Sequence, residues 1–341
     1  MNKYGFISIC KAVKVLPFYL FTLFLLACGT SSGYFKIEGR FLHINQGELY
    51  VYSPDGAITG MDTIKIEAGR FAYETKLDAD GTLMLVFPNF SEHPVFAESG
   101  EAVEVKADAS HLKEMTVKGT DDNELMNKFR KMVVSASPPE ERQHATQFVK
   151  DHPHTRVSTY LIRKYFIQTP EPDYRQALSL LEIMLKEQPR DNVLLRLKML
   201  VSPLAKNAIG STLPNFSVTD INGKAVSDAD YRTGTVVISV WMSQNYDSQE
   251  QQRLLRNMQN EGKALKLLSI NIDPDVKDCK RIMEREEITW SVICDGMMME
   301  SKLVQQLGLT SLPDNIIVKD GRVIARGLDV AALQNKLNSL R

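Results

Sequence analysis

The alternation of hydrophobic and polar residues divides the chain into three zones. From residue 34 to residue 119, short runs such as FKIEGRFLHI, GELYVYS and TLMLVFP are separated by Gly, Pro, Asn and Asp turns. A period of two is typical of half-buried strands, so this zone is expected to form an antiparallel β-sandwich domain.

The period changes to that of helices over residues 120–207. Segments such as NELMNKFRKMVV and YRQALSLLEIMLKEQ carry apolar residues three and four positions apart, which predicts helices with one buried face. Prolines separate these segments, and proline commonly ends a helix. The breaks occur at Pro138, Pro139, Pro153, Pro170 and Pro189.

Strand and helix patterns alternate over residues 208–341. TVVISVWM predicts a buried strand, YDSQEQQRLLRNMQN a helix, and NIIVKDGRVIARG a hairpin with a tight turn at Asp320 and Gly321. Alternation of this kind predicts a sheet covered by helices. The whole chain is therefore expected to be an α+β multidomain protein.

The N-terminus has the features of a secretion signal. Lysines precede an apolar stretch, Val15–Ala27, that is short for a membrane-spanning helix. Leu25–Cys28 resembles a bacterial lipobox, which implies cleavage of a signal peptide over residues 1–27 and lipidation of Cys28. Several acyl chains, at about 0.8 kcal/mol per buried methylene, would hold the protein on a membrane. The alternative is an ordinary signal peptide with Cys28 as a free thiol.

The next residues, 28–33, form a short polar tether without acidic residues. This favours attachment in the cell envelope, on the periplasmic side. No second membrane segment is expected.

Composition and charge exclude several classes of function. The chain has 41 basic and 42 acidic residues with no basic block, so nucleic acid is not an expected partner. No glycine-rich phosphate motif occurs, and no cofactor is expected. The histidines are scattered, so no metal site is expected. They are His43, His93, His111, His144, His152 and His154.

The segment LPNFSVTDINGKAVSDADYRTGTVVISVWMSQNYDSQEQQ resembles the opening of a thioredoxin-like domain of the TlpA and alkyl-hydroperoxide-reductase superfamily. Trp241, the terminal hairpin KDGRVIARG and Pro313, at the family's cis-proline position, extend the resemblance over residues 208–341. Residues 34–119, with DTIKIEAGRFAY and ESGEAVEV, are similar to a sandwich domain of unknown function that precedes this fold in envelope lipoproteins.

The resemblance places Asn245 and Ser248 where the family has its two cysteines. Disulfide exchange needs a thiolate near a helix N-terminus and a second thiol, which an amide and a hydroxyl cannot replace. No histidine follows His154, so Ser248 has no base to make it a nucleophile. We expect Asn245 and Ser248 to cap a helix, with Asp247 and Glu250 as a capping box.

Two cysteines lie elsewhere in this domain. Cys279 falls early in a predicted helix and Cys294 at the end of the next strand, which places both at the same sheet edge. A structural disulfide, two free thiols and a displaced redox pair all fit this spacing. The methionines at 297–299 follow Cys294 and are expected to pack.

Three functions fit these features. The favoured one is a lipoprotein, attached to the membrane through Cys28, that binds an envelope protein or peptide near Trp241, Leu312 and Pro313 and is not an active oxidoreductase at its loop. The second is a thiol-disulfide oxidoreductase that uses Cys279 and Cys294. The third is a structural subunit with an apolar partner surface on the sandwich.

Overall fold

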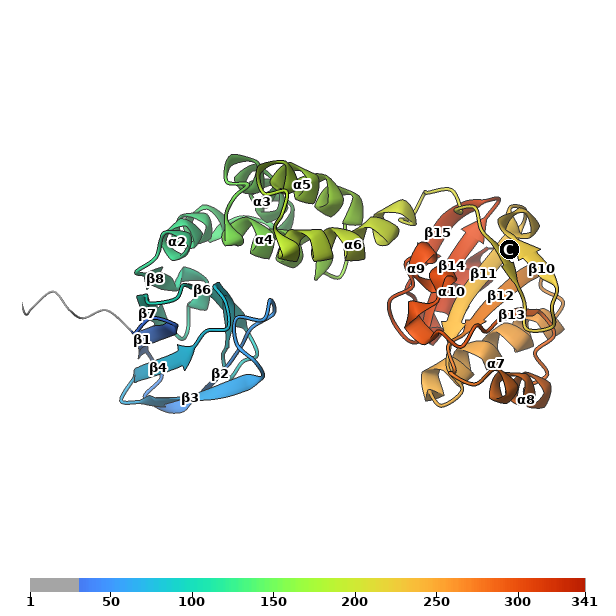
Figure 1. The fold of residues 1–341 in the computed structure, drawn as a ribbon, viewed down its shortest axis with the longest axis horizontal. Helices are drawn as coiled ribbons and strands as arrows, with labels where there is room; N and C mark the ends of the chain where they lie inside the picture. The colour runs from blue at the N-terminus through green and yellow to red at the C-terminus, as the bar shows by residue number, and fades with distance from the viewer. Residues whose placement is uncertain (1–30, 341) are drawn as a thin grey trace, which may run out of the picture. The chain divides into compact units, whose positions relative to one another are not determined.

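The computed structural model describes residues 31–340. The chain divides into two compact units, one ending at Leu161 and the other beginning at Ile162 (Figure 1). The division falls inside the predicted helical zone, so that zone contributes helices to both units. The expected order of a β-rich domain, a helical stretch and an α/β domain is confirmed.

An eight-stranded sheet, in the order β6-β5-β2-β3-β4-β1-β7-β8, forms most of the first unit. Neighbouring strands are antiparallel except β1 and β7, which are parallel, in contrast to the antiparallel pairing that was expected throughout. The strands are β1 (Tyr34–Leu42), β2 (Gln46–Tyr52), β3 (Met61–Glu67), β4 (Arg70–Lys76), β5 (Gly81–Val86), β6 (Glu92–Ala97), β7 (Ala102–Asp108) and β8 (Thr116–Lys118).

The predicted alternation of strand residues produces the core of this unit. In β1 the side chains of Phe35, Ile37 and Phe41 are buried, and they join one apolar cluster with residues of the other strands. Gly39 lies opposite Phe71, and a Cβ atom there would lie only 2.0 Å from the Phe71 ring. A side chain at position 39 would therefore displace the ring that stacks on Phe41.

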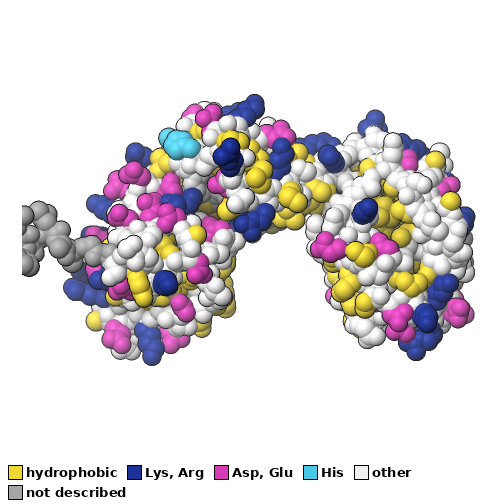
Figure 2. Space-filling model, in the orientation of Figure 1, with side chains coloured by type: hydrophobic (Ala, Val, Ile, Leu, Met, Phe, Trp, Pro, Cys, Tyr) yellow, Lys and Arg dark blue, Asp and Glu magenta, His cyan; other side chains and the backbone are white. Residues whose placement is uncertain are grey.

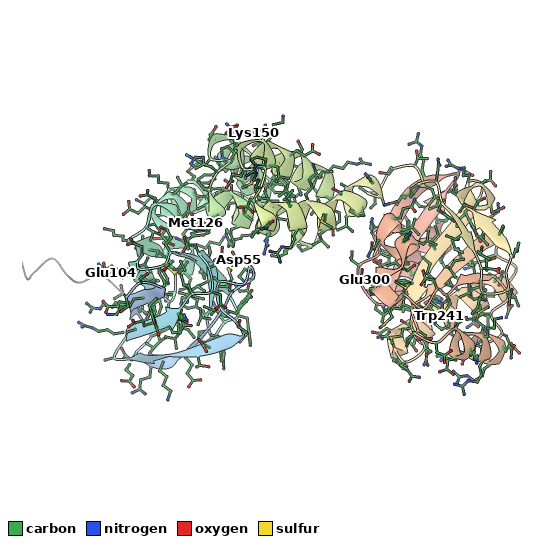
Figure 3. All side chains as sticks on the ribbon, viewed as in Figure 1. Asp55, Glu104, Met126, Lys150, Trp241 and Glu300 are labelled. Atoms are coloured by element: carbon green, nitrogen blue, oxygen red, sulfur yellow. The ribbon has the colours of Figure 1, made fainter. Side chains whose placement is uncertain are left out.

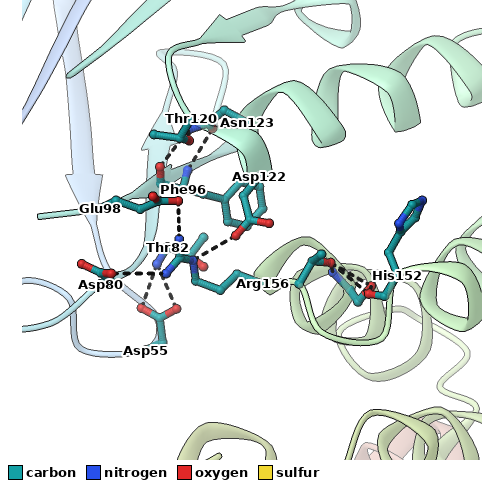
Figure 4. A network of polar contacts seen from close by, with 12 residues as sticks. Asp55, Asp80, Thr82, Phe96, Glu98, Thr120, Asp122, Asn123, His152 and Arg156 are labelled. Carbon is teal, nitrogen blue, oxygen red and sulfur yellow. Dashed lines mark hydrogen bonds and ion pairs between the residues drawn. The ribbon is translucent and has the colours of Figure 1, made fainter. Parts of the chain in front are cut away.

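Short helices follow the sheet in the first unit: η2 (Leu112–Glu114), α2 (Asp121–Val133), α3 (Pro138–Asp151) and α4 (Arg156–Ile162). Arg156, at the start of α4, joins three carboxylates (Figure 4). Its guanidinium lies 2.6 Å from Glu98, 3.1 Å from Asp122 and 3.8 Å from Asp80. Asp80 directly precedes β5, Glu98 directly follows β6 and Asp122 lies in α2, so the cluster fastens helices to the ends of strands.

The second unit begins with helices: the π-helical turn η3 (Arg163–Ile167), α5 (Tyr174–Glu187) and α6 (Asn192–Lys206). Asp173 caps α5 and Asp191 caps α6 through their side-chain oxygens, which accept backbone N–H groups of the first turn. The Asn207 amide, directly after α6, donates to the carbonyl of Gln306 at 2.9 Å. This bond connects the end of α6 to the α/β domain that follows.

A five-stranded sheet, in the order β13-β12-β11-β14-β15, forms the α/β domain. The first three strands in this order are parallel to one another. Strand β14 is antiparallel to β11, and β15 is antiparallel to β14. The elements are β9 (Ser217–Thr219), β10 (Ala225–Ser227), η4 (Asp228–Tyr231), β11 (Thr235–Trp241), α7 (Tyr246–Asn260), β12 (Leu265–Asn271), α8 (Val276–Arg285), β13 (Ser291–Ile293), η5 (Met298–Glu300), α9 (Lys302–Leu307), β14 (Asp314–Lys319), β15 (Arg322–Arg326) and α10 (Val330–Ser339).

The two faces of this sheet bury separate apolar cores. Val236, Ile238 and Val240 of β11 join the core that contains α9. Val237 and Trp241 join the core that contains residues of α7, α8 and α10. The hairpin turn predicted for the last two strands is confirmed, since Asp320 and Gly321 both have positive φ angles, as a tight two-residue turn requires.

Basic and acidic side chains are interspersed over the face seen in Figure 2, without a large region of one sign. None of the helices within residues 31–340 is long and apolar enough to cross a bilayer.

Candidate functional site

The candidate site lies where the parallel strands β11, β12 and β13 end. Their last residues are Trp241, Asn271 and Ile293, and the loops after them lead into α7, α8 and η5. In open α/β sheets, ligands commonly bind outside the carboxyl ends of the strands. The predicted loop around Asn245 and the two predicted cysteine positions lie at this same edge.

Asn245 caps α7. Its Oδ1 accepts the backbone N–H of Ser248 at 2.8 Å, as a helix N-cap does. The expected capping box of Asp247 and Glu250 does not form, because the helix begins at Tyr246. Asp247 instead lies exposed in the first turn, where its charge favours the helix dipole, and Glu250 accepts from the Tyr246 hydroxyl.

Ser248 is fully buried in the first turn of α7. Its hydroxyl has no hydrogen-bond partner within residues 31–340. A buried hydroxyl without a partner costs about 1–3 kcal/mol, so this position is better suited to a small apolar or thiol side chain. The first turn of α7 therefore contains a small, enclosed side-chain position.

Trp241 lies at the end of β11 (Figure 3). Its side chain is only 1% exposed and packs in the core that contains Leu255 and Ile282. The alternation along β11 turns Trp241 to the same face as Val237, toward α7 and α8. The prediction that Trp241 contacts a bound peptide is therefore wrong, whereas Leu312 and Pro313 are half-buried and lie outside that core.

Cys279 and Cys294 meet at the sheet edge. Cys279 is buried in the second turn of α8, and Cys294 follows β13 and is partly exposed. Both are free thiols, and Cys294 packs against the apolar cluster that contains Cys279. The structure thus brings together two residues that are fifteen positions apart in the sequence, as their predicted places on helix and strand required.

The two thiols have different acidities. Hydrogen bonds from the Cys279 thiol and from the Gly296 backbone N–H hold the pKa of Cys294 below its ordinary value. Burial and the charges of Asp273 and Asp295 oppose this effect. The hydrogen bond to Cys294 raises the pKa of Cys279, and burial raises it further. The exposed thiol is therefore the more acidic of the two.

A chain of polar contacts connects this pair to the first loop. The Cys294 thiol donates to the Asn271 side-chain oxygen at 3.4 Å, and the Asn271 amide donates to the Asp273 carboxylate at 2.9 Å. The same carboxylate accepts the backbone N–H of Ser243 at 3.0 Å. All three strand ends are thus joined by buried polar groups.

Neither Asn271 nor Asp273 was predicted as part of the site. The sequence did contain a signal, because NID places two polar side chains directly after a run of buried strand residues. Polar groups at that point of a parallel strand reach the edge where ligands bind. Gly296 was missed because its contribution is a backbone N–H group.

Asp314 organises the segment before β14. Its buried carboxylate accepts the backbone N–H groups of Thr310 at 2.8 Å and Asn315 at 2.8 Å. The Leu312–Pro313 peptide bond is cis, as the resemblance implied. Because Asp314 pairs with Val240 of β11, Leu312 lies beside the start of the loop that carries Asn245.

Two further expectations concern ligands and lipid. No group of side chains within residues 31–340 has the arrangement of a metal site. Cys28, the signal peptide over residues 1–27 and residues 29–30 of the tether lie outside the described residues.

Two family models match the chain. Residues 35–126 match a domain of unknown function (DUF4369), and residues 209–326 match the AhpC/TSA family. No curated protein matches the sequence.

Solved structures from Bacteroides species are also similar to the chain. A thiol-disulfide oxidoreductase from Bacteroides fragilis NCTC 9343 is 24% identical over 38% of this chain and 100% of its own, with a TM-score of 0.35. The thioredoxin domain of a thiol-disulfide oxidoreductase from Bacteroides vulgatus is 20% identical over 39% and 99%, with a TM-score of 0.34. A thioredoxin-like protein from Bacteroides caccae ATCC 43185 is 16% identical over 59% and 78%, with a TM-score of 0.45.

Proposed function

Because residues 209–326 form a thioredoxin-like domain of the AhpC/TSA family with Asn245 and Ser248 in place of the loop cysteines, we propose that this domain binds an extended segment of a partner protein and exchanges no disulfides at the loop. The observation that carries the proposal is the backbone of Leu312. Its N–H and C=O groups make no hydrogen bond within residues 31–340, although the segment lies beside the end of β11.

Unpaired backbone groups next to a strand are the means by which a sheet accepts an added peptide strand. The Asp314 carboxylate holds the backbone on both sides of Leu312, through Thr310 and Asn315. The segment is therefore ordered before a peptide arrives, which lowers the entropic cost of binding. Tyr246, which is 68% exposed at the start of α7, offers an aromatic side chain on the neighbouring loop.

The proposed site of action is the cell envelope. In this proposal residues 1–27 are removed, Cys28 carries the lipid, and the periplasmic side is favoured by the polar tether. The partner is then an envelope protein that passes close to the membrane surface.

A partner surface on the sheet of the first unit has less support. A hollow of about 930 Å³ lies there, over β1, β3, β4 and β7. Basic and acidic side chains both line it, among them Arg40, Arg70, Glu38 and Glu104. That lining does not have the apolar character which a structural assembly surface requires.

The peptide proposal is tested with the chain from residue 29 onward and an unfolded polypeptide whose cysteines are blocked. Leu312→Pro removes the backbone N–H, and Leu312→Ala is the matched control that keeps it. We expect the proline variant to bind roughly tenfold more weakly, the equivalent of one lost hydrogen bond, and the alanine variant to bind within about threefold of the parent. Equal binding by the two variants would contradict the proposal.

Hydrogen exchange provides a second measurement that does not depend on how the proline variant folds. Addition of the polypeptide to the unaltered chain should slow exchange of the Leu312 amide. An unchanged rate at saturating polypeptide would exclude strand addition at this position.

Attachment to the membrane is tested separately with the full chain. The parent should partition into the detergent phase after expression in a Gram-negative host, and Cys28→Ser should lose this partition. A variant that stays in the detergent phase would refute lipidation at Cys28.

A further inference from the structure

We propose that Cys294 and Cys279 form a second site in this domain, which exchanges disulfides with polypeptide substrates at the end of β13 instead of at the loop before α7. This inference goes beyond the proposed peptide binding, which involves no covalent step. It rests on the packing of both cysteines at one cluster, the difference in their exposure, and the groups that surround Cys294.

The exposure of the two cysteines gives each a distinct role. Cys294 is partly exposed and can meet a disulfide from solution, whereas Cys279 is fully buried and cannot attack a substrate before Cys294 does. Exchange requires such an arrangement of an attacking and a resolving thiol. Because Cys294 packs against the cluster that contains Cys279, the resolving thiol lies close to the attacking one before a substrate arrives.

The loop after β13 supplies a donor to Cys294. The backbone N–H of Gly296 lowers the pKa of Cys294, and Gly296 itself adopts a φ of 72°. A Cβ atom at this position would lie 3.2 Å from the carbonyl oxygen of Pro274. Both the φ angle and the close approach favour glycine at this position. Backbone N–H donors and a second thiol stabilise the thiolate, which is the nucleophile in exchange.

The surroundings of the pair point to polypeptide disulfides as the substrate class. Met297 is 57% exposed and Met298 45% exposed, and they lie three and four positions after Cys294 in the chain. Val276, in the turn of α8 before Cys279, is 38% exposed. Flexible methionine side chains suit apolar segments of varied sequence. No block of basic residues lies within positions 294–300 to favour a small anionic disulfide.

Each sulfur–sulfur bond that forms in the exchange replaces one that breaks. The Cys294 thiolate attacks one sulfur of the substrate, so that a mixed disulfide forms, the substrate S–S bond breaks and a substrate thiolate leaves. The leaving thiolate takes the proton of Cys279, and the Cys279 thiolate attacks Cys294. The second substrate sulfur leaves as a thiolate and takes a proton from water. The substrate gains two electrons and the pair becomes a disulfide, which a separate dithiol protein reduces for the next cycle.

The test uses the chain from residue 29 onward, in which Cys279 and Cys294 are the only cysteines. The substrate is insulin and the reductant is a small dithiol. We expect the parent to reduce insulin at least tenfold faster than Cys294→Ser. Cys279→Ser lacks the resolving thiol and should accumulate a mixed disulfide between Cys294 and an insulin chain, detectable by mass spectrometry. Equal rates for the parent and Cys294→Ser, or no mixed disulfide in Cys279→Ser, would overturn the proposal.

A second measurement separates a reactive pair from two merely packed thiols. The pH dependence of Cys294 alkylation is compared between Cys279→Ser, whose hydroxyl still donates a hydrogen bond, and Cys279→Ala, which removes the donor. We expect the midpoint to lie at higher pH in the alanine variant. Identical midpoints would show that Cys279 does not act on Cys294, which also overturns the proposal.

Discussion

The loop of residues 242–248 and the pair Cys279–Cys294 lie at the same edge of one sheet. They differ in two features, a capped helix start and the presence of sulfur. The loop retains the helix cap of Asn245 and a buried first-turn position at Ser248, and it has no sulfur. The pair has both sulfurs, yet Cys279 lies within α8 and Cys294 in a loop.

The difference shows which features of a redox site depend on the fold alone. Asn245 accepts the N–H group that could otherwise stabilise a thiolate, so the cap stabilises the helix without any reactive atom. At the pair, the Gly296 N–H and the Cys279 thiol supply the stabilisation that a helix N-terminus usually gives. A thioredoxin-like fold therefore predicts the loop geometry, whereas a site of exchange has to be argued from the residues themselves.

The largest expected effect comes from returning sulfur to the loop. In a chain from residue 29 onward that carries Cys279→Ser and Cys294→Ser, the added changes Asn245→Cys and Ser248→Cys should create insulin reductase activity at least 100-fold above background. The reason is that position 245 lies at the N-terminus of α7, where N–H groups lower a thiol pKa. The assay is insulin turbidity with a dithiol reductant.

The matched control is Asn245→Cys alone in the same background. It has an attacking thiol and no resolving thiol, so it should form a mixed disulfide and show no turnover. If the double replacement is folded but inactive, cysteines at positions 245 and 248 are not sufficient for exchange, which contradicts the prediction.

A smaller effect concerns alkaline pH. Because the folded state raises the pKa of Cys279, its thiol stabilises the fold fully below the unfolded thiol pKa of about 8.5, and this contribution is lost as the pH rises above it. The parent should lose about 1 kcal/mol more unfolding free energy than Cys279→Ser between about pH 8.5 and pH 9.5. Urea unfolding under reducing conditions measures this difference, and parallel pH profiles would contradict it.

The smallest effect tests the cap. Asn245→Ala should lower the unfolding free energy by about 1 kcal/mol, and Asn245→Asp should keep it, since aspartate caps as well as asparagine. Both variants should leave the alkylation rate of Cys294 unchanged. A change in that rate would show that the loop and the pair are coupled more tightly than their chain of polar contacts indicates.

Most of the C-terminal fold could be predicted because its elements are long and periodic. The helix over residues 246–260 and the strand at 235–241 follow directly from hydrophobic spacing. Strand β6 was missed because Glu92, His93 and Pro94 hide a short buried run. The parallel pairing of β1 with β7 was also missed, because strand patterns do not determine which distant strand becomes a neighbour.

The candidate site could be predicted in part. The shared edge of Cys279 and Cys294 followed from their places on helix and strand. Their hydrogen bond depends on side-chain directions that spacing does not give. Trp241 was predicted to contact a peptide because the loop begins directly after it. The alternation of side chains along β11 turns it into the core instead. The Gly296 N–H and the Leu312 backbone carry no side-chain signal.

A redox titration of the chain from residue 29 onward tests the central claim most directly, namely that thiol chemistry belongs to the pair and not to the loop. The folded protein is equilibrated with mixtures of reduced and oxidised glutathione, quenched in acid and weighed by mass spectrometry. The account predicts that Cys279 and Cys294 interconvert reversibly, as one two-electron couple, between two thiols and a disulfide lighter by two hydrogens. Two thiols that stay reduced throughout, or a disulfide that glutathione and dithiols cannot reduce in the folded protein, would contradict it.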